Sequence, residues 1–319
     1  MAAPQPQPLA PGTAASVSVP ATSANLGPGF DSMGLALELR DEVTLTVVAG
    51  PDVAEAEGEG AATLPRDGAH LILRLAHEHL RDRGFTAPGL HLRAVNRIPH
   101  ARGLGSSAAA VVAAYAAAEA LLPAALRRAP ADLLEAATRF EGHPDNVAPA
   151  LVGGATVSWT RDDVPGHATA RLRLHERVVP VVAIPDTELS THVARGVLPA
   201  EVPHAAAAAQ AGRAALLVHA LAEDPALLLA ATRDWLHQEP RAVAMPASAA
   251  LVAGLRERGH AAVVSGAGPT VLALCDGVQA AEHAAEAARA LTADGAASWR
   301  VLVPCVAVDG VRVESLHHG

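Results

Sequence analysis

Lysine is absent from this 319-residue chain, whose 24 basic residues are all arginine. This absence excludes every mechanism that depends on a lysine side chain, such as a Walker A phosphate loop, a protein-kinase ATP lysine or a Schiff base. Cysteine is scarce as well, since Cys275 and Cys305 are the only two and form no CxxC pair. A disulfide framework or a cysteine-type zinc site is therefore not expected.

Aromatic residues and positive charge are also in short supply. The chain has three Phe, three Trp and one Tyr, and its net charge is −9. Nucleic-acid partners are excluded, because they need stacking aromatics or a basic surface. The longest apolar run, from Ala108 to Ala118, is too short to span a bilayer, and no basic residue precedes an apolar stretch at the N-terminus. We expect a cytoplasmic protein with neither nucleic-acid nor membrane partners.

What is present indicates a globular α+β protein of two domains. Half of the residues are hydrophobic, and the length suits about two domains. Residues 1–15, rich in Pro, Ala and Gln, are predicted to be a disordered tail. The N-terminal domain is predicted over 16–165 and the C-terminal domain over 166–319, because the polar stretch 161–166 with its Pro and Gly is typical of a junction. Strand and helix patterns then mix without the regular alternation of a doubly wound fold.

The strongest local motif lies directly before an alanine-rich helix predicted over about 106–122. Glycine allows a tight turn and a close approach to a ligand, and the first N–H groups of a helix attract an anion. The motif therefore predicts phosphate binding, although a plain serine N-cap after a glycine turn is an alternative. The predicted nucleotide-binding residues here are Pro99, His100, Ala101, Arg102, Gly103, Leu104, Gly105, Ser106, Ser107, Ala108 and Ala109.

Three further segments carry polar or glycine-rich patterns. A loop within 21–34 presents Asn25 and Asp31, whose amide and carboxylate suit a hydroxyl and an ammonium, or merely an Asx-type turn. Residues 265–270 place Gly266 and Gly268 between two predicted strands, as a tight turn or as a backbone passing close to a ligand. In the segment 141–146, Glu141 suits Mg²⁺, which prefers carboxylate and phosphate oxygens.

Together these four segments, taken in their order along the chain, resemble the GHMP kinase superfamily and, within it, the homoserine kinases. The resemblance implies a ribosomal-S5-domain-2-like N-terminal domain and a ferredoxin-like C-terminal α/β sandwich, with the active site between them. It implies MgATP-dependent phosphorylation of the L-homoserine hydroxyl, a step of threonine biosynthesis. Homoserine kinases are often dimeric, so a homodimer is one expectation.

The resemblance also implies roles for individual residues. Ser107 and Glu141 would hold Mg²⁺, with Glu135 as the alternative ligand, and Gly266 and Gly268 would join the nucleotide site. The predicted catalytic residues are Asn25, Ser107, Glu141 and Asn146. The predicted substrate-binding residues are Asn25, Asp31, His143, Asn146, Thr191, Arg195 and Arg241.

Two positions set this chain apart from parts of the superfamily. Asn146 stands where relatives with a catalytic base carry Asp, and an amide cannot accept a proton, so catalysis by alignment is expected. Asp145 is an alternative base or a turn residue. His70 replaces an Asn that some relatives place at the nucleotide, so no firm nucleotide contact is assigned to it.

Two other functions remain open at this stage. A GHMP kinase for mevalonate, shikimate or another small alcohol would leave Asp31 without a cation to bind. Loss of phosphate-loop or carboxylate residues would favour a catalytically silent sensor of ATP or a metabolite, but residues 103–109 and Glu141 are intact.

Overall fold

The longest strand, β3 (Met33–Val48), forms the centre of the N-terminal lobe. Along its second half Val43, Leu45 and Val47 are buried while the residues between them are more exposed. Such a period of two gives a strand one core-facing side. β3 pairs antiparallel with β2 (Ala14–Ala24) and with β6 (Gly89–Asn96), which places the polar loop 25–32 at one end of the sheet.

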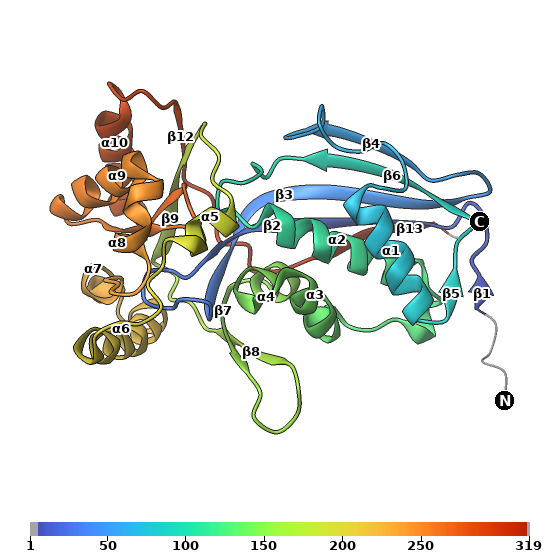
Figure 1. Ribbon diagram of the computed structural model, residues 1–319, viewed down its shortest axis with the longest axis horizontal. Helices are drawn as coiled ribbons and strands as arrows, with labels where there is room; N and C mark the ends of the chain where they lie inside the picture. The colour runs from blue at the N-terminus through green and yellow to red at the C-terminus, as the bar shows by residue number, and fades with distance from the viewer. Residues whose placement is uncertain (1–5, 318–319) are drawn as a thin grey trace.

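In the computed structural model, which describes residues 6–317, this sheet has seven strands (Figure 1). Their order is β13-β2-β3-β6-β4, and β7 joins β3 to β8. Helices cover one face of the sheet. The remaining elements of this lobe are β1 (Gln7–Pro8), β4 (Val53–Gly58), α1 (Leu71–Asp82), β5 (Phe85–Thr86), α2 (Ser106–Leu121), η1 (Ala124–Leu126), η2 (Pro130–Leu133), α3 (Leu134–Glu141), α4 (Pro144–Val152), β7 (Ala155–Thr160), β8 (His167–Leu172) and β13 (Arg312–His317).

Helix α2 is buried almost all round, which explains its composition. Thirteen of its sixteen residues are buried, and most of these are alanine. The small side chains let α1, α4 and β2 approach the helix closely, as dense interior packing requires. The first turn of α2 is the exception, because Ser106 and Ser107 are not buried and line cavities.

The C-terminal lobe is a four-stranded antiparallel sheet of order β10-β11-β9-β12. With α9 and α10 on one face, the chain order βαββαβ and this strand order define a ferredoxin-like unit. The predicted α+β fold is thus confirmed. The elements are β9 (Val178–Pro185), α5 (Thr191–Gly196), α6 (His204–Ala222), η3 (Pro225–Leu227), α7 (Leu228–Ala231), α8 (Gln238–Arg241), η4 (Ala242–Ala244), α9 (Pro246–Glu257), β10 (Ala261–Val264), β11 (Val271–Asp276), α10 (Val278–Thr292) and β12 (Trp299–Leu302).

The lobes do not follow the predicted boundary at 165/166. Strand β8 forms a hairpin with β7 and so belongs to the N-terminal sheet. Strand β13 returns to pair antiparallel with β2, so the chain end also belongs to that sheet. The prediction of a C-terminal domain over 166–319 is wrong at both ends, because unpaired sheet edges recruit strands from distant sequence.

The predicted disordered tail over 1–15 is wrong for its second part. Gln7 and Pro8 pair with β5, Leu9 is buried, and residues 14–15 already belong to β2. Residues 1–5 lie outside the described part of the chain. The proline-rich composition of this segment predicted disorder, but proline is tolerated at the edge of a sheet, and the segment therefore can form a short edge strand.

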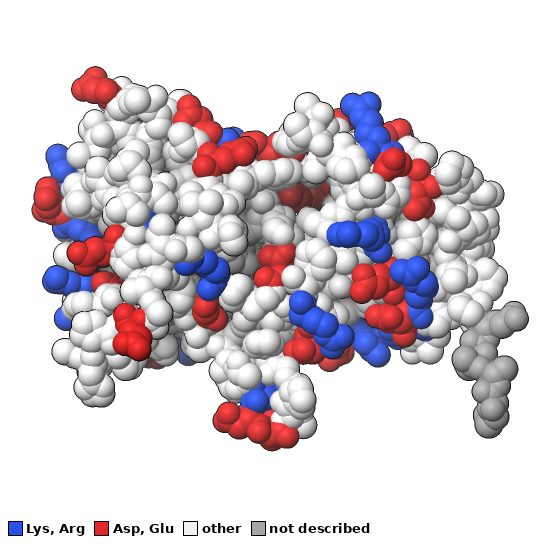
Figure 2. All heavy atoms as spheres, viewed as in Figure 1, with Lys and Arg blue, Asp and Glu red and all other residues white. Residues whose placement is uncertain are grey.

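The visible face of the molecule carries charges of both signs. Figure 2 shows arginines scattered among carboxylates there, without a continuous basic area. Between residues 6 and 317, α6 is the one helix that meets the length and apolarity expected of a membrane-crossing segment. Its apolarity comes largely from alanine, and Leu217 and Leu221 are buried in the protein core.

Candidate active site

Three loops that are far apart in the sequence meet at the N-terminus of α2. Ser265 Oγ donates to the carbonyl of Gly103 at 2.6 Å and lies 2.8 Å from Ser23 Oγ. The N–H of Gly266 donates to the carbonyl of Ala24 at 3.1 Å. Three of the four predicted motifs therefore form one hydrogen-bonded wall, to which both lobes contribute.

Glycine is required in the loop before α2 for two reasons. Gly103 and Gly105 have φ values of +74° and +69°, a region that side chains disfavour. A Cβ on Gly105 would collide with Thr22 Oγ1 and lie 3.0 Å from Asn146 Oδ1. The loop therefore leaves the first N–H groups of α2 open to an anion.

The side chain of Arg102 does not join this anion site. Its guanidinium donates to the carbonyls of Pro185 and Asp186 in the C-terminal lobe, at 3.2 and 2.7 Å. Arg102 therefore fixes the loop between the lobes, and only its backbone remains a candidate for phosphate contact.

Ser107 and Glu141 lie together at the start of α2. Ser107 Oγ donates to Glu141 Oε1 at 2.5 Å, and burial raises the pKa of Glu141 despite this hydrogen bond. A hydroxyl and a carboxylate are oxygen ligands that fit Mg²⁺, which usually takes one or two protein ligands beside phosphate and water. Glu135 instead accepts the N–H of His167 at 3.0 Å, beside the β7–β8 hairpin. Within residues 6–317, no group of three His, Cys, Asp or Glu side chains offers a site built wholly from protein.

A cavity of about 320 Å³ adjoins this pair. Its polar lining comes from both lobes, with Arg195 on α5 and Arg241 on α8 facing residues from α3 and α4. Among the predicted residues, Asn25, Ser107, Glu141, His143, Asn146, Thr191, Arg195, Arg241 and Gly266 line it.

Asp31 and Arg195 form a bidentate ion pair at the edge of the cavity. The two N···O distances are 2.5 and 3.2 Å, and both side chains are about one-third exposed. Asp31 is held in place by its left-handed backbone, φ +55°, and by its N–H, which donates to Asn25 Oδ1. The two groups assigned to opposite ends of the substrate thus neutralise each other here.

Arg241 is the largest fully buried side chain, at 1% exposure. Its Nε donates to the carbonyl of Ala194 and its Nη1 to the carbonyl of Gly266. Burial, and then the charge of Arg195, lower the pKa of Arg241. Its guanidinium carbon lies 5.3 Å from the ring centre of Phe30, a contact that helps to hold a desolvated cation.

The first turn of α4 supplies three more groups. Asn146 Oδ1 accepts from Thr22 Oγ1 at 2.9 Å, which fixes its amide towards the cavity. Asp145 is buried, and burial together with the nearby charge of Asp31 raises its pKa to about 7. Burial and then Arg195 lower the pKa of His143.

Asn25 has a more structural position than its predicted role. Its Nδ2 donates to the carbonyl of Gly266 at 2.8 Å, and its Oδ1 accepts from the N–H of Asp31 at 3.0 Å. The amide therefore fastens the polar loop to the C-terminal lobe.

A second cavity of about 260 Å³ lies on the other side of Ser107, which lines both. His70, the N-cap of α1, lines it too. Its Nδ1 accepts from the N–H of Ile72, so the ring proton lies on Nε2, which is buried without a partner in the described chain. Burial lowers the pKa of His70, which keeps the ring neutral.

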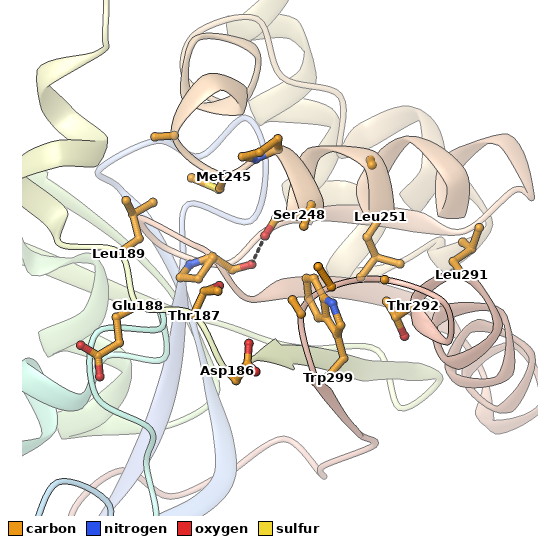
Figure 3. Close-up of a pocket in the computed structure, with 18 residues that line it drawn as sticks. Asp186, Thr187, Glu188, Leu189, Met245, Ser248, Leu251, Leu291, Thr292 and Trp299 are labelled. Atoms are coloured by element: carbon orange, nitrogen blue, oxygen red, sulfur yellow. Dashed lines mark hydrogen bonds between the residues drawn. The ribbon is translucent and has the colours of Figure 1, made fainter.

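The cavity in Figure 3, of about 850 Å³, is larger than both but differs in chemistry. It lies within the C-terminal lobe, where Met245, Leu251 and Trp299 face an apolar interior. Its charged lining residues are Asp186 and Glu188. A polyphosphate would meet only negative charge there, so this cavity is not the nucleotide site.

The sequence analysis gave no role to Phe30 or His237, although both lie close in sequence to residues with predicted roles. Their rings stack with centres 4.9 Å apart, behind Arg195 and Arg241. Their nearness in sequence to Asp31 and Arg241 was the available signal.

The two-lobed fold and the glycine loop at a buried helix define a GHMP kinase. The family models for the GHMP kinase N-terminal and C-terminal domains match residues 70–154 and 205–296. A homoserine kinase from Streptomyces coelicolor is 53% identical over 262 residues, 82% of this chain and 84% of the relative. One from Clavibacter michiganensis is 46% identical over 313 residues, 98% of this chain and 97% of the relative.

The crystal structure of a homoserine kinase from Cytophaga hutchinsonii superposes with a TM-score of 0.85 at 27% identity, covering 94% of this chain and 97% of that one. The chain belongs to the homoserine kinase family.

Proposed function

We propose that this chain transfers the γ-phosphoryl group of ATP to the side-chain hydroxyl of L-homoserine, giving ADP and O-phospho-L-homoserine, in the cytoplasm and as a step of threonine biosynthesis. Membership of the family supports the reaction. The observation that supports this substrate is the cavity lined by Arg195 and Arg241 beside Ser107 and Glu141, with Asp31 paired to Arg195 next to it. A homodimer stays a prediction.

Substrate binding exchanges one ion pair for two. The ammonium of L-homoserine would take Arg195's place on Asp31, and the carboxylate would bind Arg195 and Arg241. Because the substrate is a zwitterion, every charge in the cavity keeps a partner and the net charge does not change. Leaving a charge unpaired in such a half-buried place is costly, which favours zwitterions over simple alcohols.

The nucleotide would lie across the N-terminus of α2. The backbone of residues 103–107 would bind the phosphates, while Ser107 and Glu141 would hold Mg²⁺, which neutralises phosphate charge when bound. The 260 Å³ cavity would take the adenine. There the Nε2–H of His70, at the position where some relatives place an Asn at the nucleotide, would be a donor for a ring nitrogen.

The transfer step depends on alignment. The hydroxyl oxygen attacks the γ-phosphorus in line, the bond to the β–γ bridging oxygen breaks, and the hydroxyl proton leaves. Asn146, held by Thr22, can orient the hydroxyl but cannot take its proton. Asp145, with its pKa raised to about 7, is therefore a better candidate for a base than Asn146.

The two other functions lack a comparable observation. Mevalonate and shikimate carry a carboxylate but no ammonium, so neither could replace Arg195 as the partner of Asp31. A silent sensor would not need the Ser107–Glu141 pair beside the phosphate loop.

The test is ADP release with MgATP and a panel of L-homoserine, L-serine, L-threonine, mevalonate and shikimate, with products identified by mass. We expect turnover with L-homoserine and formation of O-phosphohomoserine. Turnover with another alcohol alone would retain the kinase and discard the zwitterion pocket, and ATP binding without any turnover would favour the sensor.

A further inference from the structure

His237 directly precedes α8 and is fully buried behind the cavity of about 320 Å³ that would hold the amino-acid substrate. Its Nδ1 lies 3.1 Å from Nη1 of Arg241, and its Nε2 lies 2.8 Å from the carbonyl oxygen of Gly27. One ring thus touches both the arginine that would bind the substrate carboxylate and the loop that carries Asp31.

The two partners fix the tautomer of this ring. A guanidinium can only donate a hydrogen bond and a carbonyl can only accept one. Nδ1 of His237 is therefore the acceptor, and the single ring proton lies on Nε2. A second proton would point at Arg241 and add a positive charge beside it.

Buried groups around the ring hold it in place. The carboxylate of Asp234 accepts the N–H groups of His237 and Gln238, each at 2.9 Å, and its other oxygen lies 3.4 Å from His237 Nε2. Gln210 donates to Asp234 at 2.8 Å and to the carbonyl of Pro28 at 3.0 Å. This network joins α6 and α8 to the loop of Asp31.

Phe30 completes the arrangement on the cavity side. Its ring stacks on His237, and the guanidinium carbons of Arg195 and Arg241 lie 5.5 and 5.3 Å from its centre. Arg241 and the Asp31 loop are thus set relative to each other through His237 and Phe30.

We propose that His237 is a positioning residue for the amino-acid substrate: as a neutral acceptor it orients the guanidinium of Arg241, and through Gly27 it holds the loop of Asp31 at a fixed distance. The inference rests on the proposed function and deepens it, because it names what lets one pocket bind both ends of a zwitterion.

Two substitutions separate the two hydrogen bonds of the ring. In His237→Asn the amide oxygen can replace Nδ1 as acceptor for Arg241, whereas in His237→Gln the amide nitrogen can replace Nε2 as donor to Gly27. We expect His237→Gln to raise KM for L-homoserine roughly tenfold, as for the loss of one charge-assisted hydrogen bond, and His237→Asn to raise it much less. KM for ATP should stay near its wild-type value in both.

Two controls distinguish positioning from general loss of structure. His79→Gln removes another buried histidine, bonded to Glu119 in the other lobe at 2.6 Å, and should lower Tm without changing KM for L-homoserine. In an Arg241→Ala background, His237→Gln should add little to KM, because the guanidinium it orients is gone.

Three results would overturn the proposal. His237→Gln could raise KM equally for ATP and L-homoserine, or it could raise KM for L-homoserine by the same factor in the Arg241→Ala background as in the wild type. The third result is a smaller rise in KM for L-homoserine in His237→Gln than in His237→Asn. If His237→Gln fails to fold, ¹⁵N NMR of the wild type decides instead. Nδ1 should be unprotonated and should shift with L-homoserine but not with ATP, and a protonated Nδ1 would contradict the inference. Absence of homoserine-dependent ADP release by the wild type is a separate outcome, which rejects the proposed function itself.

Discussion

Glu135 and Glu141 belong to the same short helix, α3, but they face different surroundings. Glu141 bonds Ser107 beside the phosphate loop, whereas Glu135 bonds the backbone of the β7–β8 hairpin. Their positions in the sequence did not show which of them is the metal ligand, although two side chains six residues apart on a helix point in different directions. The hydrogen bond to Ser107 distinguishes Glu141 from Glu135.

Replacing Glu141 by Gln should therefore weaken metal binding. We expect a fall in kcat of at least tenfold and a higher Mg²⁺ concentration for half-maximal rate, since one anionic ligand is lost. Steady-state rates across an Mg²⁺ titration measure this. Glu135→Gln is the matched control and should leave the Mg²⁺ requirement unchanged, and the reverse pattern would move the metal ligand to Glu135.

Asp145 should make the stability of the protein depend on pH. Its pKa in the folded state is about 7, above the usual aspartate value of 3.8, so between these pH values the folded state keeps a proton that the unfolded state has lost. Stability from this group is therefore present below about pH 4 and falls as pH rises to about 7.

Asp145→Asn removes this dependence. The variant should be more stable than the wild type at pH 8, by on the order of 2–4 kcal/mol, and the difference should shrink towards pH 4. Urea unfolding at several pH values measures it, with exposed Asp162→Asn as a control. A constant difference between the curves would contradict the ionisation argument.

At the scale of elements, the loop between β6 and α2 concentrates strain and close contacts. Gly105→Ala would combine a left-handed φ with a collision against Thr22, so we expect a fall in Tm and a KM for ATP raised at least tenfold, since the phosphate-binding N–H groups would shift. Gly84→Ala is the matched control, with φ +77° and open space around the new Cβ. It should cost about 1–2 kcal/mol of stability and leave KM unchanged.

Local sequence could predict elements with helical periodicity or with a strongly helix-forming composition. The helical spacing of residues 278–292 predicts a helix that α10 matches residue for residue, and the helix predicted from the alanine-rich composition over 106–122 matches α2 to within one residue. Helix α4 was missed because Pro144 and Pro149 suggest turns, although proline at a first helical turn is favourable. The acidic residues and glycines of segment 55–60 predict a turn, but most of this segment forms β4, whose Glu55 and Glu57 are exposed at a sheet edge.

The candidate site was predictable in membership but not in arrangement. The motifs gave nearly every residue that lines the cavity, because each motif carries unusual residue types. They did not give the Asp31–Arg195 ion pair, which joins residues 164 positions apart. Nor did they give the roles of Phe30 and His237, which depend on how α8 packs against the loop 25–31.

At the scale of the whole molecule, the C-terminal strand binds the two lobes into one unit. Ala307 and Val311 are buried in the N-terminal lobe, and β13 covers the edge of β2. A chain ending at Leu302 would lose this burial, so its Tm should be lower and its free energy of unfolding smaller by about 2–4 kcal/mol. It should also aggregate more readily, because the edge of β2 would be exposed. Calorimetry and light scattering measure both effects. An unchanged Tm would mean that the N-terminal lobe is complete without β13.

The returning strand also means that the backbone passes between the lobes twice, once after Leu172 and again after Leu302. Two covalent connections restrict the rotation of one lobe relative to the other more than a single connection would. Any motion of one lobe against the other during a catalytic cycle must therefore bend both connections at once.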